Sequence, residues 1–238
     1  MKNRQKKILR AIVEKFIRSA SPVGSGFLAK FFNFEFSSAT IRNEMRELER
    51  AGLLKSPHTS AGREPTTGGF RFFVSDLQTE FLANLRPAAA KNFRTTREKY
   101  FAAKRADEKV FDAISILSNL VENVAFATVP SARHTFFLGI GKMLAQPEFA
   151  IDPVLSSTVV RVLEEKFSEF LQNLDLKNEV QIFIGAENLL PEIQSCTLLV
   201  ARAEINSRKI AVGILGPQRM DFARNILALE NCLEFLGN

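Results

Sequence analysis

Tryptophan is absent from this 238-residue chain, tyrosine occurs once, and there are only two cysteines and two histidines. Because Cys196, Cys232, His58 and His134 are scattered, they lack the spacing of metal ligands, and we expect neither a metal site nor a disulfide framework. Apolar runs that approach the roughly 20 residues needed to cross a bilayer are also missing. The basic N-terminal segment has neither the apolar core nor the cleavage site of a signal peptide. These absences indicate a cytoplasmic protein.

Signs of catalysis are equally scarce. No Ser/His/Asp, Cys/His or paired-carboxylate constellation stands out in the sequence. The tripeptide Gly139-Ile140-Gly141 is a lone GxG without a third glycine or a phosphate-binding lysine, which favours a turn or close packing over a nucleotide loop. We therefore expect that the protein is not an enzyme and that it needs no cofactor.

Basic charge is concentrated at one end of the chain. Residues 1–76 hold 14 Lys/Arg and 7 Asp/Glu, a balance of +7, whereas residues 77–238 hold 18 and 19, a balance of −1. A basic module joined to a neutral remainder is typical of nucleic-acid binding, although many enzymes also have basic faces.

The stretch from Ser37 to Thr66 begins with an amphipathic helix. Ser37 or Ser38 supplies a hydroxyl to cap the helix, and Gly52 follows its last turn, where a left-handed residue is favoured. The stripe expected to face a core contains Ile41, Met45 and Leu48. The opposite, polar side contains Thr40, Arg42, Asn43, Arg46 and Arg50. Short donors near a helix N-terminus with arginines behind them suit base edges flanked by phosphates, and Ser38 is also a candidate phosphate donor.

A β-hairpin is predicted directly after this helix. Residues 53–56 form a short strand, residues 60–63 form the turn and return, Pro65 ends the hairpin, and Thr66 or Thr67 caps the next helix. The polar, basic tip, suited to phosphates or the minor groove, contains His58, Thr59, Ser60 and Arg63. Gly62 is expected to serve the turn.

Two more helices precede the polar one. Residues 4–19 form the first, Ser21-Pro22 breaks it, and Ser25 caps a short second helix. Three helices of which the last two lie close in sequence predict a helix-turn-helix, and the hairpin makes it winged. A fourth helix is expected from Thr67 to about residue 85, and its Arg71 is a further candidate phosphate contact.

The words ATIRNEM, PHTSAGR-x-PT and GFRFFV, in this order, resemble the N-terminal domain of the heat-inducible transcription repressor HrcA family, and SPVGSGFLAK is similar to the family's segment before the recognition helix. The resemblance implies a bacterial repressor that binds double-stranded DNA at an inverted-repeat operator of chaperone operons. It also implies a homodimer and modulation by the chaperonin GroEL.

The second half reads as an α/β domain. Strands are predicted at residues 123–129, 180–185, 196–204 and 209–215, with an amphipathic helix before them and two apolar-striped helices, at about 160–174 and 222–236, between and after them. Asp221 is expected to cap the last helix, and Arg219 to pair with a neighbouring acid. Residues 86–109 hold eight Lys/Arg and three acids, which indicates a basic linker helix or a second phosphate contact.

The words FFLGIGKMLAQPEF, IFIGAEN, CTLLVA and GILGPQRMDFAR are similar to the C-terminal part of the same family, where the resemblance implies a GAF-like fold with an inserted dimerising domain. Only residues 130–135 separate the first strand from FFLGIGKML, so the insertion is missing here. The expected fold is α+β: a winged helix-turn-helix domain over 1–85, a linker helix over 86–109 and a shortened GAF-like α/β domain over 110–238.

Two other functions stay open. A ligand-responsive regulator would have a closed apolar pocket with convergent polar groups in its second half, which a solid core would rule out. A non-repressing interaction module would keep the fold and remain a monomer.

Overall fold

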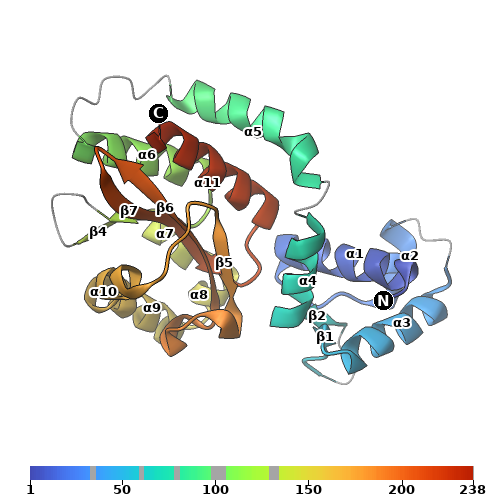
Figure 1. Ribbon diagram of the computed structural model, residues 1–238. Coiled ribbons are helices and arrows are strands. Elements are labelled where there is room, and N and C mark those ends of the chain that lie inside the picture. Colours follow the sequence, from blue (N-terminus) through green and yellow to red (C-terminus); the bar gives the residue numbers. More distant parts are fainter. Residues whose placement is uncertain (33–35, 59–61, 78–80, 98–105, 129–133, 238) are drawn as a thin grey trace. The chain divides into compact units, whose positions relative to one another are not determined.

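The computed structural model describes residues 1–32, 36–58, 62–77, 81–97, 106–128 and 134–237 of the chain (Figure 1). The chain divides into two compact units, Met1–Glu80 and Phe81–Asn238. The division falls five residues before the expected boundary at residue 85, and the helix expected to be a linker belongs to the second unit. Mixed helix and sheet in this arrangement confirms the α+β class.

The first unit is a small helical domain with a two-stranded hairpin (Figure 1). Its elements are α1 Asn3–Ser19, α2 Ser25–Phe31, α3 Ser38–Arg50, β1 Leu54–Lys55, β2 Glu64–Pro65 and α4 Thr67–Leu77. The core contains Ile8, Leu9, Ile12, Leu28, Ile41, Met45, Leu48, Leu54, Phe70 and Val74, all buried. Burial of Ile41, Met45 and Leu48 confirms the apolar stripe predicted for α3, and these periodic residues pack the helix on the core.

The hairpin is held to the helices by a third extended segment. Leu54 pairs with Pro65 and Lys55 with Glu64 in antiparallel register. The Val23 N–H donates to the Arg63 carbonyl at 2.8 Å, and the Arg63 N–H donates to the Val23 carbonyl at 2.9 Å. We call β1, β2 and the residues between them the wing. Three helices with this small sheet make the first unit a winged helix-turn-helix.

Two glycines allow the backbone to connect the wing to α3 and to Val23. Gly52 has a φ of +73°, the left-handed conformation predicted for the residue after α3. A Cβ on Gly62 would lie 2.4 Å from the Val23 carbonyl carbon, so Gly62 allows the wing to approach Val23 closely. Its role is this close approach of two backbones in addition to any part in the turn.

The second unit contains a five-stranded antiparallel sheet in the order β4-β3-β7-β6-β5. Its strands are β3 Val124–Thr128, β4 Thr135–Leu138, β5 Gln181–Ile184, β6 Cys196–Ile205 and β7 Arg208–Pro217. Its helices are α5 Phe81–Arg97, α6 Ala106–Leu120, α7 Ile140–Leu144, α8 Pro147–Ala150, α9 Pro153–Glu165, α10 Phe167–Asn173 and α11 Phe222–Gly237, with 3-10 turns η2 Gly185–Glu187 and η3 Pro191–Ile193.

Helices cover both faces of this sheet (Figure 1). One face carries α6 and α11, and α5 packs on α11 through the rings of Phe93 and Phe235, whose centroids are 6.1 Å apart. The other face packs against α7 to α10 in a core centred on Phe126 and Phe167, which are both fully buried. The ring centroids of this pair lie 5.0 Å apart.

Several predicted boundaries were wrong. The fourth helix ends at Leu77 and does not reach residue 85, and the next helix, α5, begins at Phe81 and contains Pro87. Proline removes one N–H donor from a helix, and Pro87 is exposed, so a helix packed on α11 through other residues tolerates it. Strand β4 and helices α7 and α8 were not predicted. Within the described residues, no helix has the length and apolar character that crossing a membrane requires.

Candidate nucleic-acid interface

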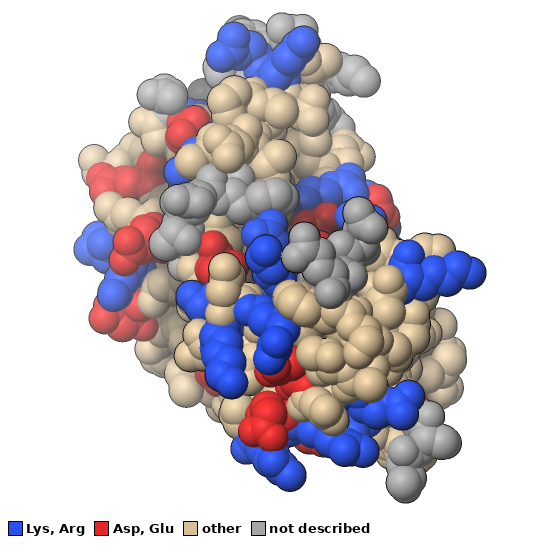
Figure 2. Space-filling view, turned by 90° about the vertical axis from the view of Figure 1, so that its right-hand side faces the viewer, with Lys and Arg blue, Asp and Glu red and all other residues tan. Residues whose placement is uncertain are grey.

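The polar side of α3 is open to solvent in the first unit. Arg42, Asn43 and Arg46 are exposed and Thr40 is half-buried, whereas Ile41 on the opposite side is fully buried. Among the described residues, neither Arg42 nor Arg46 forms an ion pair. Figure 2 shows Lys and Arg side chains spread over the face of the molecule that it presents, with acidic side chains between them. The arrangement leaves two guanidinium groups and one amide available to an outside partner.

The start of α3 is fixed by two serines with different partners. Ser37 is the N-cap: its Oγ accepts from the Thr40 N–H at 3.2 Å and lies 3.0 Å from the Thr40 Oγ1. Ser38 Oγ instead lies 3.2 Å from Ser25 Oγ, which joins the first turns of α2 and α3. The prediction that Ser25 caps α2 is wrong, since Gly24 is the N-cap and Ser25 is buried inside the first turn.

The acidic residues of α3 are placed differently: Glu44 faces the core, whereas Glu47 is exposed and pairs with Arg50 on the polar side. Glu44 is buried and forms an ion pair with Arg4 of α1. The Arg4 guanidinium also lies 5.4 Å from the centroid of the Phe36 ring. At the end of the helix, Arg50 Nη1 contacts Glu47 Oε1 at 2.6 Å, so this arginine of the predicted polar face is already paired.

The wing places its predicted contacts differently. His58 is exposed, and its carbonyl accepts from Ser56 Oγ at 2.7 Å. Thr59 and Ser60 lie outside the described residues. Arg63 is mostly buried, with its Nε donating to Glu49 Oε2 at 3.0 Å and its Nη1 donating to Ser56 Oγ at 3.0 Å. Through these bonds, the Arg63 side chain links the wing to α3.

The fourth helix begins beside the wing with its own cap. Thr66 Oγ1 accepts from the Gly69 N–H at 3.1 Å and donates to the Gly52 carbonyl at 2.6 Å, which identifies the cap that the sequence left open between Thr66 and Thr67. Arg71, the remaining candidate, is half-buried in the second turn of α4.

In the second unit, the segment that contains the GxG tripeptide packs against the end of α6 and the residues that follow it. Gly139 has a φ of +89°, and a Cβ there would lie 2.6 Å from the Asn123 carbonyl oxygen, so close packing explains it as predicted. Lys142 Nζ donates to the Ser118 carbonyl at 2.5 Å and to the Val121 carbonyl at 3.3 Å. A cation at these carbonyls stabilises the C-terminal end of α6.

Arg219 and Arg224, just before and within the first turn of α11, make further contacts with α8 and α6. Arg219 contacts Glu148 through two bonds, Nε to Oε1 at 2.5 Å and Nη2 to Oε2 at 2.9 Å. Arg224 Nε donates to the Leu120 carbonyl at 2.6 Å, and the Arg224 N–H donates to Asp221 Oδ1 at 3.1 Å. The predicted cap of α11 is confirmed, and Arg219 pairs with an acid as expected, although that acid, Glu148, is distant in the sequence. These side chains are therefore occupied in holding α6, α8 and α11 together.

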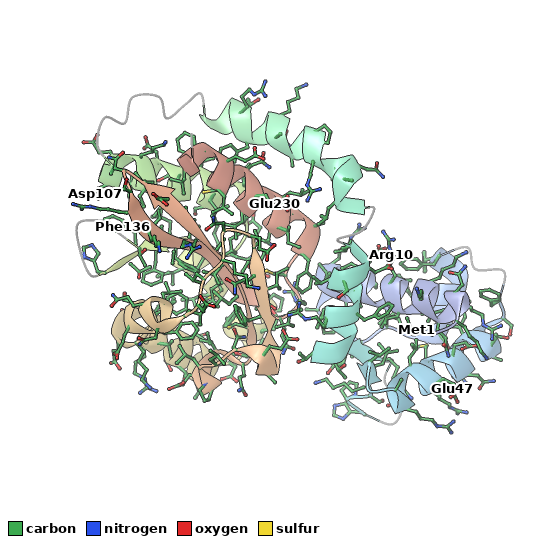
Figure 3. All side chains as sticks on the ribbon, viewed as in Figure 1. Met1, Arg10, Glu47, Asp107, Phe136 and Glu230 are labelled. Carbon is green, nitrogen blue, oxygen red and sulfur yellow. The ribbon has the colours of Figure 1, made fainter. Side chains whose placement is uncertain are left out.

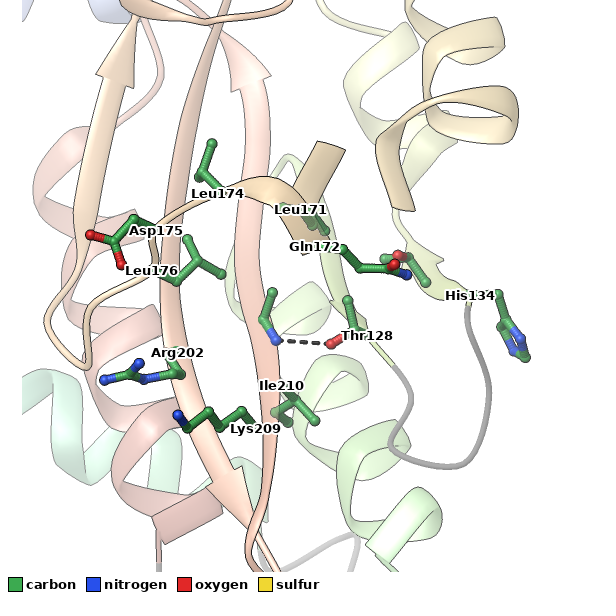
Figure 4. Close-up of a pocket in the computed structure, with 12 residues that line it drawn as sticks. Thr128, His134, Leu171, Gln172, Leu174, Asp175, Leu176, Arg202, Lys209 and Ile210 are labelled. Carbon is green, nitrogen blue, oxygen red and sulfur yellow. Dashed lines mark hydrogen bonds between the residues drawn. The ribbon is translucent and has the colours of Figure 1, made fainter. Parts of the chain in front are cut away.

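A cavity of about 400 Å³ opens beside the ends of β3 and β7 (Figure 4). Ladder pairing of the two strands stops at Ala127 and Val212, and the Ala211 N–H donates instead to Thr128 Oγ1 at 2.8 Å. The lining mixes buried leucines with the exposed side chains of Asp175 and Lys209. Such a solvent-open notch differs from the closed apolar pocket expected of a ligand-responsive regulator.

Both cysteines are buried and free. Burial raises the pKa of both the Cys196 and the Cys232 thiol to about 12, so neither is a thiolate at neutral pH. No cluster of metal-ligating side chains occurs in the part of the chain that the structure describes.

Comparison with known proteins identifies the family. The family described as "HrcA protein C terminal domain" matches residues 74–226. The heat-inducible transcription repressor HrcA of Thermoanaerobacter sp. (strain X514) is 41% identical over 335 residues, covering 99% of this chain and 96% of that protein. The protein of the same name from Thermoanaerobacter pseudethanolicus is 26% identical over 335 residues, with the same coverage of 99% and 96%.

These alignments are longer than the chain itself. An aligned length of 335 residues against 238 leaves at least 97 positions (335 − 238) without a residue of this chain. A crystal structure of a hypothetical protein, solved at 2.2 Å resolution, has a TM-score of 0.80 at 18% identity and covers 100% of this chain and 96% of that one, which shows a shared fold. By the match over residues 74–226 and the 41% identity along nearly its whole length, this chain belongs to the HrcA family, whose curated members are named heat-inducible transcription repressors.

Proposed function

We propose that this member of a transcription-repressor family binds double-stranded DNA in the cytoplasm as a homodimer, at an inverted-repeat operator of chaperone operons. The observation that carries the proposal is the open side of α3, where Arg42, Asn43 and Arg46 are exposed next to the wing. In a winged helix-turn-helix, the helix in this position enters the major groove and the wing lies along the backbone. We assign DNA binding to the first compact unit.

The three side chains have the chemistry that base reading needs. An arginine guanidinium donates two parallel hydrogen bonds to the O6 and N7 of guanine, and an asparagine amide pairs with the N6 and N7 of adenine. Arg42 and Asn43 lie in the first half of α3, close to its N-terminus, and Arg46 follows one turn later. Thr40 contributes a hydroxyl in the first turn, although that hydroxyl is shared with Ser37.

The remaining candidate residues are assigned either to contacts with DNA phosphates or to holding α3 in place. His58, Thr59 and Ser60 of the wing and Arg71 of α4 are proposed backbone contacts, while Ser38 and Arg63 hold α3 to α2 and to the wing. Phosphate contacts release counterions, so affinity should fall steeply as salt is raised. Sequence preference would then rest on Arg42, Asn43 and Arg46.

A homodimer follows from the two-fold symmetry of an inverted repeat. Two recognition helices reach successive major grooves when two copies are related by the same two-fold axis as the operator. Modulation by the chaperonin GroEL belongs to this proposal as well, and its support is family membership.

A binding titration tests the proposal. The full chain is titrated into a labelled chaperone-promoter fragment that contains the inverted repeat, and in parallel into a scrambled fragment of equal length. We expect at least a hundredfold preference for the promoter fragment, because specific sites bind about 10³–10⁷ tighter than random DNA. Equal affinity for the two fragments at every salt concentration would refute sequence-specific binding.

A further inference from the structure

The sheet of the second unit has one face against α7 to α10, and this face changes from apolar to polar along the strands. Successive residues of a strand point to opposite faces. The apolar part of this face contains Phe126, Leu198 and Leu215, all buried in the core. Phe136, labelled in Figure 3, points to the other face, where its ring centroid lies 6.0 Å from that of Phe111 in α6.

Three strands contribute neighbouring positions to the polar end of the face. Thr128 Oγ1 of β3 accepts from the Ala211 N–H of β7 at 2.8 Å, and Ala211 pairs with Arg202 of β6. Lys209 pairs with Glu204 and so lies two positions from Ala211 on the same face, a diagonal neighbour of Arg202 at about 7–8 Å. Because the Ala211 side chain is a single methyl group, the sheet is hollowed between Thr128 and Arg202 (Figure 4).

The cavity of about 400 Å³ lies over these positions. Ligand sites in proteins have volumes of about 300–1,000 Å³. The apolar wall of the cavity contains Leu171 and Leu176, both buried, and Leu174, the residue at which α10 ends. The cavity therefore combines a hydrocarbon wall with the polar strand positions that α10 does not cover.

Most of the polar groups in the cavity are hydrogen-bond donors. Arg202 is half-buried, and its Nε donates to the neutral Asn178 Oδ1 at 2.9 Å. Within the described part of the chain, neither Arg202 nor Lys209 forms an ion pair with a carboxylate. The Thr128 hydroxyl accepts from Ala211 and keeps its own proton to donate. A guanidinium, an ammonium and a hydroxyl together suit the oxygen atoms of an anion.

One carboxylate also lines the cavity. Asp175 is exposed just after α10, and in Figure 4 its carboxylate points away from Thr128. Arg202 and Lys209 outweigh Asp175 by one positive charge. The charge of the lining therefore favours an anion over a cation.

We propose that this cavity binds a small organic anion, with its carboxylate or phosphate group on Arg202, Lys209 and Thr128 and its hydrocarbon part against the leucines at the end of α10. An arginine fork donates two parallel hydrogen bonds to either group, and Asn178 already orients the guanidinium for this. The site is separate from the proposed DNA-binding surface, because every residue in it belongs to the second unit.

Titrations with benzoate and phenyl phosphate test the proposal, because the two probes share a ring and differ in the anionic group. Each is added to the isotopically labelled full chain and followed by nuclear magnetic resonance, beside the neutral control benzyl alcohol. We expect at least one anion to shift the amide signals of Thr128, Arg202 and Ala211 saturably, and the tighter probe identifies the preferred group. The Ala211 amide reports directly, since it donates to the Thr128 hydroxyl. Absence of saturable shifts with both anions, or equal binding of benzyl alcohol, would overturn the proposal.

A matched pair of lysine variants tests the charge. Lys209→Met is compared with Lys91→Met, an exposed lysine of α5 that does not line the cavity. Because Lys209 is also exposed, both variants should keep the parental melting temperature. We expect Lys209→Met to bind the tighter anion at least threefold more weakly, Lys209→Arg to restore most of the affinity, and Lys91→Met to match the parent. Parental affinity in a folded Lys209→Met would overturn the proposal.

Discussion

Arg63 of the wing donates to the carboxylate of Glu49 in α3 at 3.0 Å, and this pair ties the wing to the helix that carries the candidate base-reading residues. Both side chains are mostly buried, with 19% and 33% of their surfaces exposed. The pair fixes the angle between two elements that would meet the same duplex.

A double-mutant cycle on this pair tests whether Arg63 positions the wing or binds phosphate. If it positions the wing, Arg63→Ala and Glu49→Ala should weaken operator binding by similar factors, and the double variant should be little worse than either, with a coupling free energy of about 0.5–1 kcal/mol. If Arg63 binds phosphate, Glu49→Ala should strengthen binding instead. Titrations of all four proteins at one salt concentration distinguish these results.

If Arg42 and Asn43 read bases as proposed, Arg42→Ala and Asn43→Ala should each cost about 1–3 kcal/mol against the operator and less against random DNA, because each would remove a bidentate contact to a base. The matched control is Arg50→Ala on the same helix, whose guanidinium is paired with Glu47. Fluorescence anisotropy with operator and scrambled duplexes measures both affinities. Equal losses on the two duplexes would reassign Arg42 and Asn43 to backbone contacts.

Ser37→Ala should destabilise the first unit by about 1 kcal/mol, because the serine side chain accepts from the Thr40 N–H at the start of α3. Ser21→Ala is the control, since that hydroxyl donates to the exposed carbonyl of Ser19. Urea unfolding followed by circular dichroism gives both values. An unchanged midpoint for Ser37→Ala would show that the cap contributes nothing.

Arg219→Ala should destabilise the second unit by about 1–3 kcal/mol, since it leaves the Glu148 carboxylate without its two bonds. The loss should be smaller than for a fully buried pair because about a third of the Glu148 side chain is exposed. Half-site DNA binding by the first unit should not change. A fall in half-site affinity without a fall in melting temperature would contradict a purely structural role.

The local features of the first unit could be predicted from the sequence because they depend on neighbours within one or two turns. The burial of Ile41 and Leu48, the exposure of Arg42 and the left-handed Gly52 all follow from helical periodicity and backbone sterics. Strand β4 and helices α7 and α8 of the second unit were not predicted, because their formation depends on the strand pairing and packing around them, which short-range patterns do not carry.

What the sequence by itself determined is an amphipathic, serine-capped helix with an arginine-rich polar side, followed by a hairpin, because these are short-range properties of the chain. Only the tertiary structure decided which charged side chains are paired within the protein and which stay exposed to a partner. It turned Arg63 toward Glu49, paired Arg219 with a glutamate 71 positions away, and left β4 at the margin of the sheet. The reason is physical: an ion pair or a strand edge depends on which distant segments the fold brings within a few ångströms, and no local pattern records that distance.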